Sequence, residues 1–247
     1  MDGIKILIAV IAYNEEKNIR LTLSELMEHN FGFDIVVIDN GSCDRTKQIC
    51  KELGIDVISH CINTGSSFGT VMTYFLYAYQ NNYDILCQFD GDGQHIASEL
   101  PQIIEPIRND NVDYVIGSRF LEKKGFQSYF FRRIGIRLFA YISSKCIDYT
   151  VTDVTSGFRA YGKRVIKFFA KDYKHEMYDT SQLLLLSHFS GAKIKEVPVK
   201  MQERKFGKSE FNFLNAVTFP VKGIINIAGS LLQKKRIKQM VGNNYGD

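Results

Sequence analysis

The sequence predicts an α/β protein built on a mostly parallel central sheet, with helices flanking both faces. Over the first 120 residues of the 247, short apolar runs alternate with longer helix-like stretches. The runs are nearly continuous in Val, Ile and Leu, which is typical of strands buried on both faces. Hydrophobic residues make up 45% of the chain and charged residues 23%, which excludes a disordered or fibrous protein.

Each expected element follows from its own stretch of sequence. We expect strands in the apolar runs at 4–11, 35–38, 57–58, 85–89 and 112–116, and helices at 15–29, 44–53, 67–82 and 98–109. Beyond residue 120 we expect an arginine-bearing helix at 129–148, a turn-rich stretch at 153–159, a helix near 178–190, a strand near 193–200 and a helix from about 211. No Pro/Gly-rich linker interrupts the chain, so the prediction is one catalytic domain over 1–210, followed by an amphipathic helix and basic tail over 211–247.

Polar residues gather where the predicted strands end. Tyr13, Asn14 and Glu15 follow the first strand, Asp39 ends the second, and a Gly-Ser-Arg sequence follows the fifth. Ligands of parallel α/β sheets bind outside the carboxyl ends of the strands. The sequence therefore places the functional site at this edge of the sheet.

The sharpest motif lies after the fourth strand, where Asp90 and Asp92 are separated only by Gly91. Two carboxylates in a small-residue turn suit Mg²⁺ or Mn²⁺, which bind through few protein carboxylates plus phosphate oxygens. An EF-hand loop is excluded, because His95 and Pro101 stand where that loop requires Gly and Glu. A plain ATP or dinucleotide site is disfavoured, since the chain has neither a P-loop nor a GxGxxG sequence after its first strand.

Taken together, these motifs resemble the family 2 glycosyltransferases with the A-type nucleotide-sugar fold. Within that family the chain looks most like the dolichyl-phosphate mannose synthase and polyprenyl-phosphate sugar transferase branch, over about residues 4–210. The motifs that carry the resemblance are at 12–16, 39–46, 63–65, 90–95, 117–119, 153–159, 196–198 and 204–209.

The resemblance implies roles for individual residues. The donor-binding positions correspond to Tyr13, Asn14, Glu15, Asp39, Gly65, Asp90, Arg204 and Lys208. The metal ligands correspond to Asp90, Asp92 and Gln94, and the acceptor phosphate would meet Arg119 together with Arg132 or Arg133. Asp44, in contrast, is well placed as a helix cap, so we assign Asp39 to the ligand and Asp44 to local structure.

The implied reaction is an inverting transfer of a hexose from a UDP- or GDP-hexose to a polyprenyl phosphate. Mg²⁺ or Mn²⁺, held through Asp92, would neutralise the leaving diphosphate. A phosphate acceptor is already anionic and needs no general base, whereas a sugar hydroxyl in polysaccharide assembly would need one. Asp153 is the candidate base for that alternative, and capping of the following Thr-Ser-Gly turn is an equal interpretation of it. A noncatalytic scaffold is the third hypothesis, which the intact aspartates and Arg204 disfavour.

The charge of the chain is concentrated near its C-terminus. The net charge is +4, and residues 200–247 hold nine Lys and Arg against three Asp and Glu. These cations accompany an apolar helix face running from Phe211 to Leu232, which favours an anionic membrane surface over nucleic acid, so no nucleic-acid partner is expected. The alternative is a helix packed on the domain. With five cysteines and no CxxC pair, we expect a cytoplasmic enzyme, peripheral on the inner face of the membrane, which reaches its lipid directly or through a membrane-protein partner.

Overall fold

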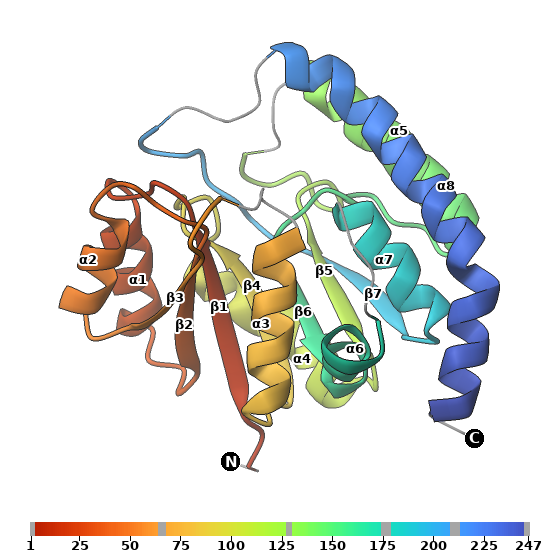
Figure 1. The fold of residues 1–247 in the computed structure, drawn as a ribbon. Helices are drawn as coiled ribbons and strands as arrows, with labels where there is room; N and C mark the ends of the chain where they lie inside the picture. The colour runs from red at the N-terminus through yellow and green to blue at the C-terminus, as the bar shows by residue number, and fades with distance from the viewer. Residues whose placement is uncertain (1–2, 64–67, 127–129, 174–178, 208–212, 245–247) are drawn as a thin grey trace.

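A seven-stranded sheet organises the chain (Figure 1). The computed structural model describes residues 3–63, 68–126, 130–173, 179–207 and 213–244, with side chains except at 68, 130–132, 213–222 and 243–244. The strand order is β3-β2-β1-β4-β6-β5-β7. The strands are β1 (Ile6–Ala12), β2 (Asp34–Asp39), β3 (Asp56–Ser59), β4 (Ile85–Asp90), β5 (Tyr114–Ser118), β6 (Arg159–Gly162) and β7 (Ile194–Pro198).

The strand register brings the predicted site residues to one edge. β1 pairs in parallel with both β2 and β4, so that Ala12 lies beside Asp39 and Ile11 beside Asp90. β7 pairs in parallel with β5, whose last residue is Ser118. The mostly parallel sheet and the common edge predicted from the sequence are confirmed.

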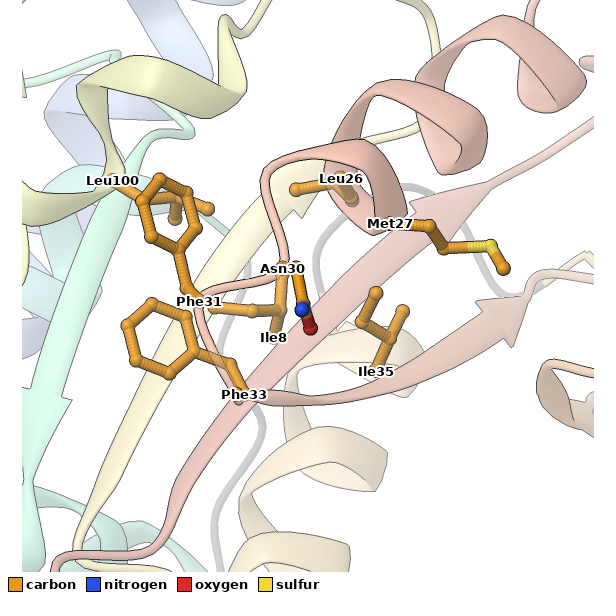
Figure 2. Close-up of a pocket in the computed structure, with 9 residues that line it drawn as sticks. Ile8, Leu26, Met27, Asn30, Phe31, Phe33, Ile35 and Leu100 are labelled. Atoms are coloured by element: carbon orange, nitrogen blue, oxygen red, sulfur yellow. The ribbon is translucent and has the colours of Figure 1, made fainter.

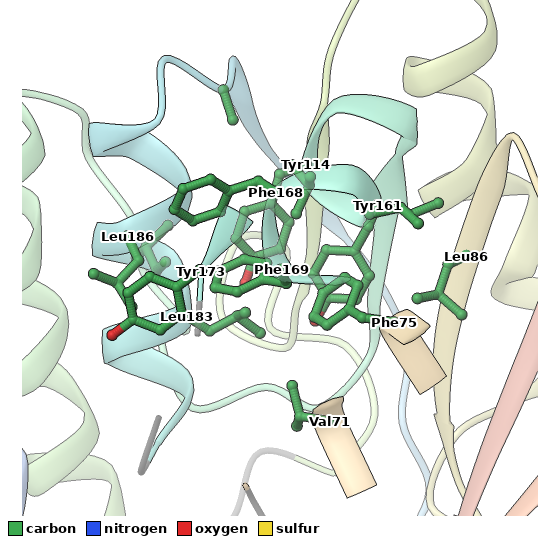
Figure 3. Packing of buried hydrophobic residues seen from close by; sticks show 14 of the residues in the cluster. Val71, Phe75, Leu86, Tyr114, Tyr161, Phe168, Phe169, Tyr173, Leu183 and Leu186 are labelled. Carbon is green, nitrogen blue, oxygen red and sulfur yellow. The ribbon is translucent and has the colours of Figure 1, made fainter. Parts of the chain in front are cut away.

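Two apolar clusters lie on the two faces of this sheet. One face is covered by α1 (Ile19–Glu28), α2 (Thr46–Glu52) and α4 (Leu100–Asn109), the last preceded by the short η1 (Ala97–Glu99). The other is covered by α3 (Phe68–Gln80), α5 (Phe130–Ile147), α6 (Lys163–Lys167), η2 (Phe168–Asp172) and α7 (Thr180–Phe189). Figure 3 shows the aromatic centre of the second cluster, where Phe75, Tyr161 and Phe169 pack together.

The strand β6 is a departure from the sequence prediction, which ends its turn-rich stretch at Arg159 and expects no strand there. β6 runs antiparallel to both β4 and β5 and separates them in the sheet. Its four residues, Arg-Ala-Tyr-Gly, form no apolar run, so local sequence does not mark them as a strand. Their strand conformation is stabilised by pairing on both sides.

The C-terminal helix α8 (Phe213–Asn244) packs against α5 and α7. Figure 1 shows it running along α5 at one side of the molecule. Its buried positions are Gly223, Ile227, Ser230 and Ile237. A different side exposes Ile224, Ile225, Leu231 and Leu232. These four belong to the apolar face predicted from the sequence. One side of α8 therefore packs on the domain, and these apolar residues are exposed on a different side of the helix.

Among the described residues, none of the helices combines enough length with enough apolar character to cross a bilayer.

Candidate active site

The loop after β1 is held open by side chains from the neighbouring loop. The backbone N–H of Asn14 donates to Ser42 Oγ at 2.9 Å, and that of Glu15 donates to Thr46 Oγ1 at 2.8 Å. Asn14 has a left-handed φ of 53°, and its Oδ1 accepts from the N–H of Cys43. With these bonds in place, α1 begins at Ile19, four residues beyond the predicted start. The Glu15 carboxylate therefore lies in the loop at the sheet edge.

Two aspartates lie near the end of β2, and the structural role expected of Asp44 is confirmed. The Asp39 side chain is completely buried and accepts from the N–H of Ser42 at 3.2 Å. Asp44 accepts from the N–H of Glu16 at 3.0 Å and from the hydroxyl of Thr46 at 2.5 Å. Both carboxylates therefore act on local structure, and the ligand role of Asp39 stays a prediction.

The loop after β4 brings the two aspartates of the metal motif to the edge. Asp92 Oδ1 accepts from the N–H of Gln94 at 3.0 Å, which folds the loop back on itself. Burial and the nearby Asp92 charge raise the pKa of Asp90, while the charges of His95 and Arg204 and a hydrogen bond from Gln88 act in the opposite direction.

Arg204 connects this loop to the first one. Its Nη2 lies 2.6 Å from Asp92 Oδ2 and 3.5 Å from Glu15 Oε1. Burial raises the pKa of Glu15, whereas a hydrogen bond from Asn18 and the charge of Arg204 oppose that shift. The structure thus brings Glu15, Asp92 and Arg204 together, although they come from three distant parts of the sequence.

The segment that carries Arg204 is attached to the site by backbone contacts. The N–H of Gln202 donates to the carbonyl of Gln94 at 2.9 Å, and His95 forms a bridge with Met201. Asn18 donates to the carbonyl of Phe206 at 3.1 Å. Arg204 is therefore fixed relative to both the metal motif and the start of α1.

The donor set suits a divalent metal bound mainly through a diphosphate. Asp90 is half-buried, with 37% of its side chain exposed, and Asp92 offers oxygen ligands two residues away. Within the described part of the chain, no group of three His, Cys, Asp or Glu side chains could hold a metal by itself. Mg²⁺ and Mn²⁺ sites of one or two carboxylates are completed by substrate phosphates, so Asp90 and Asp92 fit such an ion.

Gly157 leaves the space in which the Asp90 carboxylate lies. A Cβ at position 157 would come 2.7 Å from Asp90 Oδ2 and 3.2 Å from Gln88 Nε2. Sequence reasoning places this glycine in a turn and gives it no part in the site. Only the folded chain shows that it faces the metal motif.

Replacing Gly157 with alanine is expected to displace Asp90 and lower sugar transfer by about 10²-fold, since misplacing a reacting group by about 1 Å has effects of that size. Gly242→Ala is the matched control, because a Cβ there meets nothing within 4 Å. Steady-state transfer rates of the two variants check this. Equal rates for Gly157→Ala and the wild type would contradict the packing argument.

Arg119 and Asp153 form a buried, two-pronged ion pair. Nε of Arg119 lies 2.6 Å from Oδ2 of Asp153 and Nη2 lies 2.8 Å from Oδ1. Burial alone lowers the pKa of Arg119, but the Asp153 carboxylate more than offsets this and the net shift is upward. The charge of Asp90 adds to that upward shift.

This pair corrects the interpretation of Asp153 as a free general base or as a cap alone. Both of its oxygens are engaged by Arg119, and the hydroxyl of Thr155 donates to Oδ1 at 3.3 Å. Asp153 therefore positions Arg119. Its N–H and that of Thr152 donate to Glu196, which secures the loop that carries it.

The structure describes the remaining predicted site residues only in part. Arg133 is half-buried near the start of α5, while the side chain of Arg132 lies outside the described residues. Gly65 and Lys208 also lie outside them. Tyr13 is half-buried next to the first loop.

His95 is a site residue that sequence reasoning treats as structural or surface. Its Nδ1 accepts from the N–H of Asp90 at 3.0 Å, and its Nε2 lies 3.5 Å from Asp90 Oδ2. The ring is buried and stacks on Phe158, with centroids 4.6 Å apart. Its place three residues after Asp92 is the only sequence signal for this role.

An apolar cavity of about 250 Å³ lies at the opposite edge of the sheet (Figure 2). Ile8, Leu26, Phe31 and Phe33 are among the residues that line it. It contains none of the predicted site residues and no charged side chain. The polar cluster at the carboxyl edge is therefore the candidate active site.

Comparison with known proteins identifies the family of the chain. Residues 7–169 match the family model of glycosyl transferase family 2. The chain is 33% identical over 214 residues to a UDP-N-acetylglucosamine–dolichyl-phosphate N-acetylglucosaminyltransferase of Methanococcus voltae, covering 79% of this chain and 84% of the relative. It is 26% identical over 219 residues to a polyprenol monophosphomannose synthase of Mycolicibacterium smegmatis, covering 85% and 82%.

A solved structure supports the fold. Glucosyl-3-phosphoglycerate synthase from Mycobacterium tuberculosis, crystallised with Mn²⁺, UDP and its product, superposes with a TM-score of 0.67 at 15% identity. The match covers 92% of this chain and 80% of the synthase. The A-type fold expected from the motifs is thereby confirmed, and the chain belongs to glycosyl transferase family 2.

Proposed function

We propose that this protein transfers a hexose from a UDP- or GDP-sugar to a polyprenyl phosphate, with inversion at the anomeric carbon. The observation that carries the proposal is the buried Arg119–Asp153 pair near Asp90. Arg119 supplies a fixed cation for an acceptor phosphate. Asp153, the carboxylate that a hydroxyl acceptor would need as its base, is engaged in the ion pair. The dolichyl-phosphate and polyprenol activities of the two relatives support the same acceptor class.

Asp90 and Asp92, with Gln94, would hold Mg²⁺ or Mn²⁺, and the metal would neutralise charge on the leaving nucleoside diphosphate. Arg204 lies against Asp92 and adds positive charge on the same side. Glu15 holds Arg204 from the other loop and borders the donor position. Fixed charges of this kind stabilise the charge that develops in the transition state without reorganising.

Arg119 would orient the acceptor phosphate opposite the leaving group, with Arg133 or Arg132 from α5. A lipid phosphate is anionic near neutral pH, so its oxygen attacks without prior proton removal. A single displacement at the anomeric carbon inverts its configuration. The attack passes through an oxocarbenium-like transition state.

Membrane contact is the second part of the proposal. The exposed face of α8 carries Ile224, Ile225, Leu231 and Leu232, and Lys235 and Lys238 continue it at helical spacing. Such a face suits the interface of an anionic bilayer, where each lysine adds about 1 kcal/mol. We place the enzyme at the cytoplasmic face of the membrane on this ground, alone or with a membrane-protein partner.

Replacing both Ile225 and Leu232 with aspartate is expected to weaken binding to anionic vesicles by at least about 100-fold, because each buried side chain contributes about 1.5–3 kcal/mol. Leu21→Asp is the control, since Leu21 is 51% exposed on α1, away from α8. Co-sedimentation with phosphatidylglycerol vesicles measures the effect. Unchanged sedimentation of the double variant would contradict the assignment.

A donor panel tests the reaction itself. The protein is incubated with polyprenyl phosphate and a series of UDP- and GDP-sugars, and lipid-linked products are identified by mass. We expect one donor to give a polyprenyl phosphate-hexose. Transfer only to sugar hydroxyls would instead support the polysaccharide alternative.

A further inference from the structure

A row of buried polar side chains lies in the apolar cluster on the α3 face and ends two residues before Asp90. It begins at Arg159, which has no exposed surface, and passes through Tyr114, Tyr161 and Tyr74, which are also fully buried. It ends at Gln88, which is 7% exposed. Figure 3 shows Tyr114 and Tyr161 within this otherwise apolar packing. Burying five polar side chains is costly unless each is hydrogen-bonded, so their arrangement calls for a physical explanation.

The hydrogen-bond donors of Arg159, at the start of this row, have acceptors. Arg159 donates to the carbonyls of Ser156 and Val154 at 2.5 and 2.6 Å, and to that of Thr180 at 3.1 Å. It also donates to the hydroxyl of Tyr114. A guanidinium has donors only, so the Tyr114 oxygen serves as acceptor.

Three tyrosines lie between Arg159 and Gln88. The rings of Tyr114 and Tyr161 pack with centroids 5.0 Å apart, and those of Tyr74 and Tyr161 with centroids 6.3 Å apart. The hydroxyls of Tyr74 and Tyr161 both donate to Gln88 Oε1, at 3.1 and 3.3 Å. Two donors on one oxygen fix which end of the Gln88 amide faces the tyrosines.

The other end of the amide faces the metal motif. Gln88 and Asp90 are two residues apart on β4, so their side chains lie on the same face of the strand. A Cβ placed on Gly157 would lie 2.7 Å from Asp90 Oδ2 and 3.2 Å from Gln88 Nε2, so the carboxylate and the amide nitrogen border the same small space. A carboxylate only accepts hydrogen bonds, so the Nε2 end is the one that can donate to it, and this is the orientation that the tyrosines impose.

We propose that Gln88 is a positioning residue that orients the Asp90 carboxylate for a divalent metal, and that the hydroxyls of Tyr74 and Tyr161 orient Gln88. The proposal rests on the proposed function, because it takes Asp90 as a metal ligand. Hydrogen-bond partners behind a metal ligand set its orientation and contribute about 10- to 100-fold to metal affinity. Two hydroxyl donors on the Gln88 oxygen and an acceptor-only carboxylate beside its nitrogen specify one amide orientation.

The test measures Mn²⁺ binding by titration calorimetry in the presence of UDP or GDP. Gln88→Leu is expected to raise the Kd for Mn²⁺ by about tenfold. The double variant Tyr74→Phe/Tyr161→Phe keeps both rings but removes both donors, and is expected to weaken Mn²⁺ binding in the same direction. The double variant still tests the proposal if Gln88→Leu does not fold.

Tyr173→Phe is the matched control. Tyr173 is equally buried in the same cluster, but its hydroxyl bonds Gln233 at 3.0 Å. We expect it to lose stability like the other tyrosine variants while its Kd for Mn²⁺ stays at the wild-type value. Thermal melting of every variant separates a loss of stability from a loss of metal affinity.

Three outcomes are distinguishable. Weaker Mn²⁺ binding in Gln88→Leu and in the double tyrosine variant, but not in Tyr173→Phe, supports the proposal. Wild-type affinity in both test variants overturns it and leaves the proposed function intact. A wild-type protein that binds no Mn²⁺ with either nucleotide overturns the metal assignment on which both depend.

Discussion

Replacing Asp92 with alanine is expected to lower sugar transfer by about 10²–10³-fold, the range seen when one preorganised charge-stabilising group is removed. The variant loses a metal ligand and also the carboxylate that lies 2.6 Å from Arg204. Both cations that would neutralise the leaving diphosphate are therefore affected. Transfer rates as a function of Mg²⁺ or Mn²⁺ concentration measure the effect.

Two comparisons separate these contributions. Asp92→Asn keeps an oxygen that Arg204 can bond but removes the negative charge, so we expect it to be impaired chiefly in metal binding. Asp110→Ala is the matched control, since Asp110 is exposed and forms an ion pair with Lys195. Full activity of Asp92→Ala in EDTA would contradict the metal role.

Replacing Arg119 with leucine is expected to destabilise the fold by about 3–5 kcal/mol, because it leaves the fully buried Asp153 carboxylate without its partner. Transfer should be lost as well, since the acceptor phosphate loses its fixed cation. The free energy of unfolding from urea titration measures the first effect. The transfer rate at a temperature where the variant is folded measures the second.

The double variant Arg119→Leu/Asp153→Leu separates the two roles. Replacing both members of a buried ion pair with apolar residues is often neutral or stabilising, so we expect stability to recover. Transfer should not recover, because neither leucine can bind a phosphate. A double variant that transfers sugar at the wild-type rate would remove Arg119 from the reaction.

Most of the sheet was predictable because its central strands are continuous apolar runs. β1, β2 and β4 are largely buried, β2 and β4 end in Asp39 and Asp90, and the polar residues of the first loop follow directly after β1. β6 was not predictable in the same way, since Arg159–Gly162 is polar and short and is a strand only because β4 and β5 flank it.

The candidate site was predictable to the level of residue type and position along the chain. Asp90, Asp92 and Arg204 follow from motifs, but the ion pair between Arg204 and Asp92 joins residues 112 positions apart. The Arg119–Asp153 pair spans 34 positions, and without it Asp153 looks like a free base. Gly157 and Gln88 could not be recognised, because their roles depend on space and hydrogen bonds around Asp90 that only the packed sheet creates.

The central claim is that the acceptor is a phosphate bound by Arg119. The most direct measurement compares polyprenyl phosphate with the corresponding polyprenol, which differs only by the phosphate, using the donor found active in the panel. The account predicts a lipid-linked sugar with the phosphate and none with the alcohol. Equal transfer to both lipids, or transfer to a sugar hydroxyl and none to polyprenyl phosphate, would contradict it.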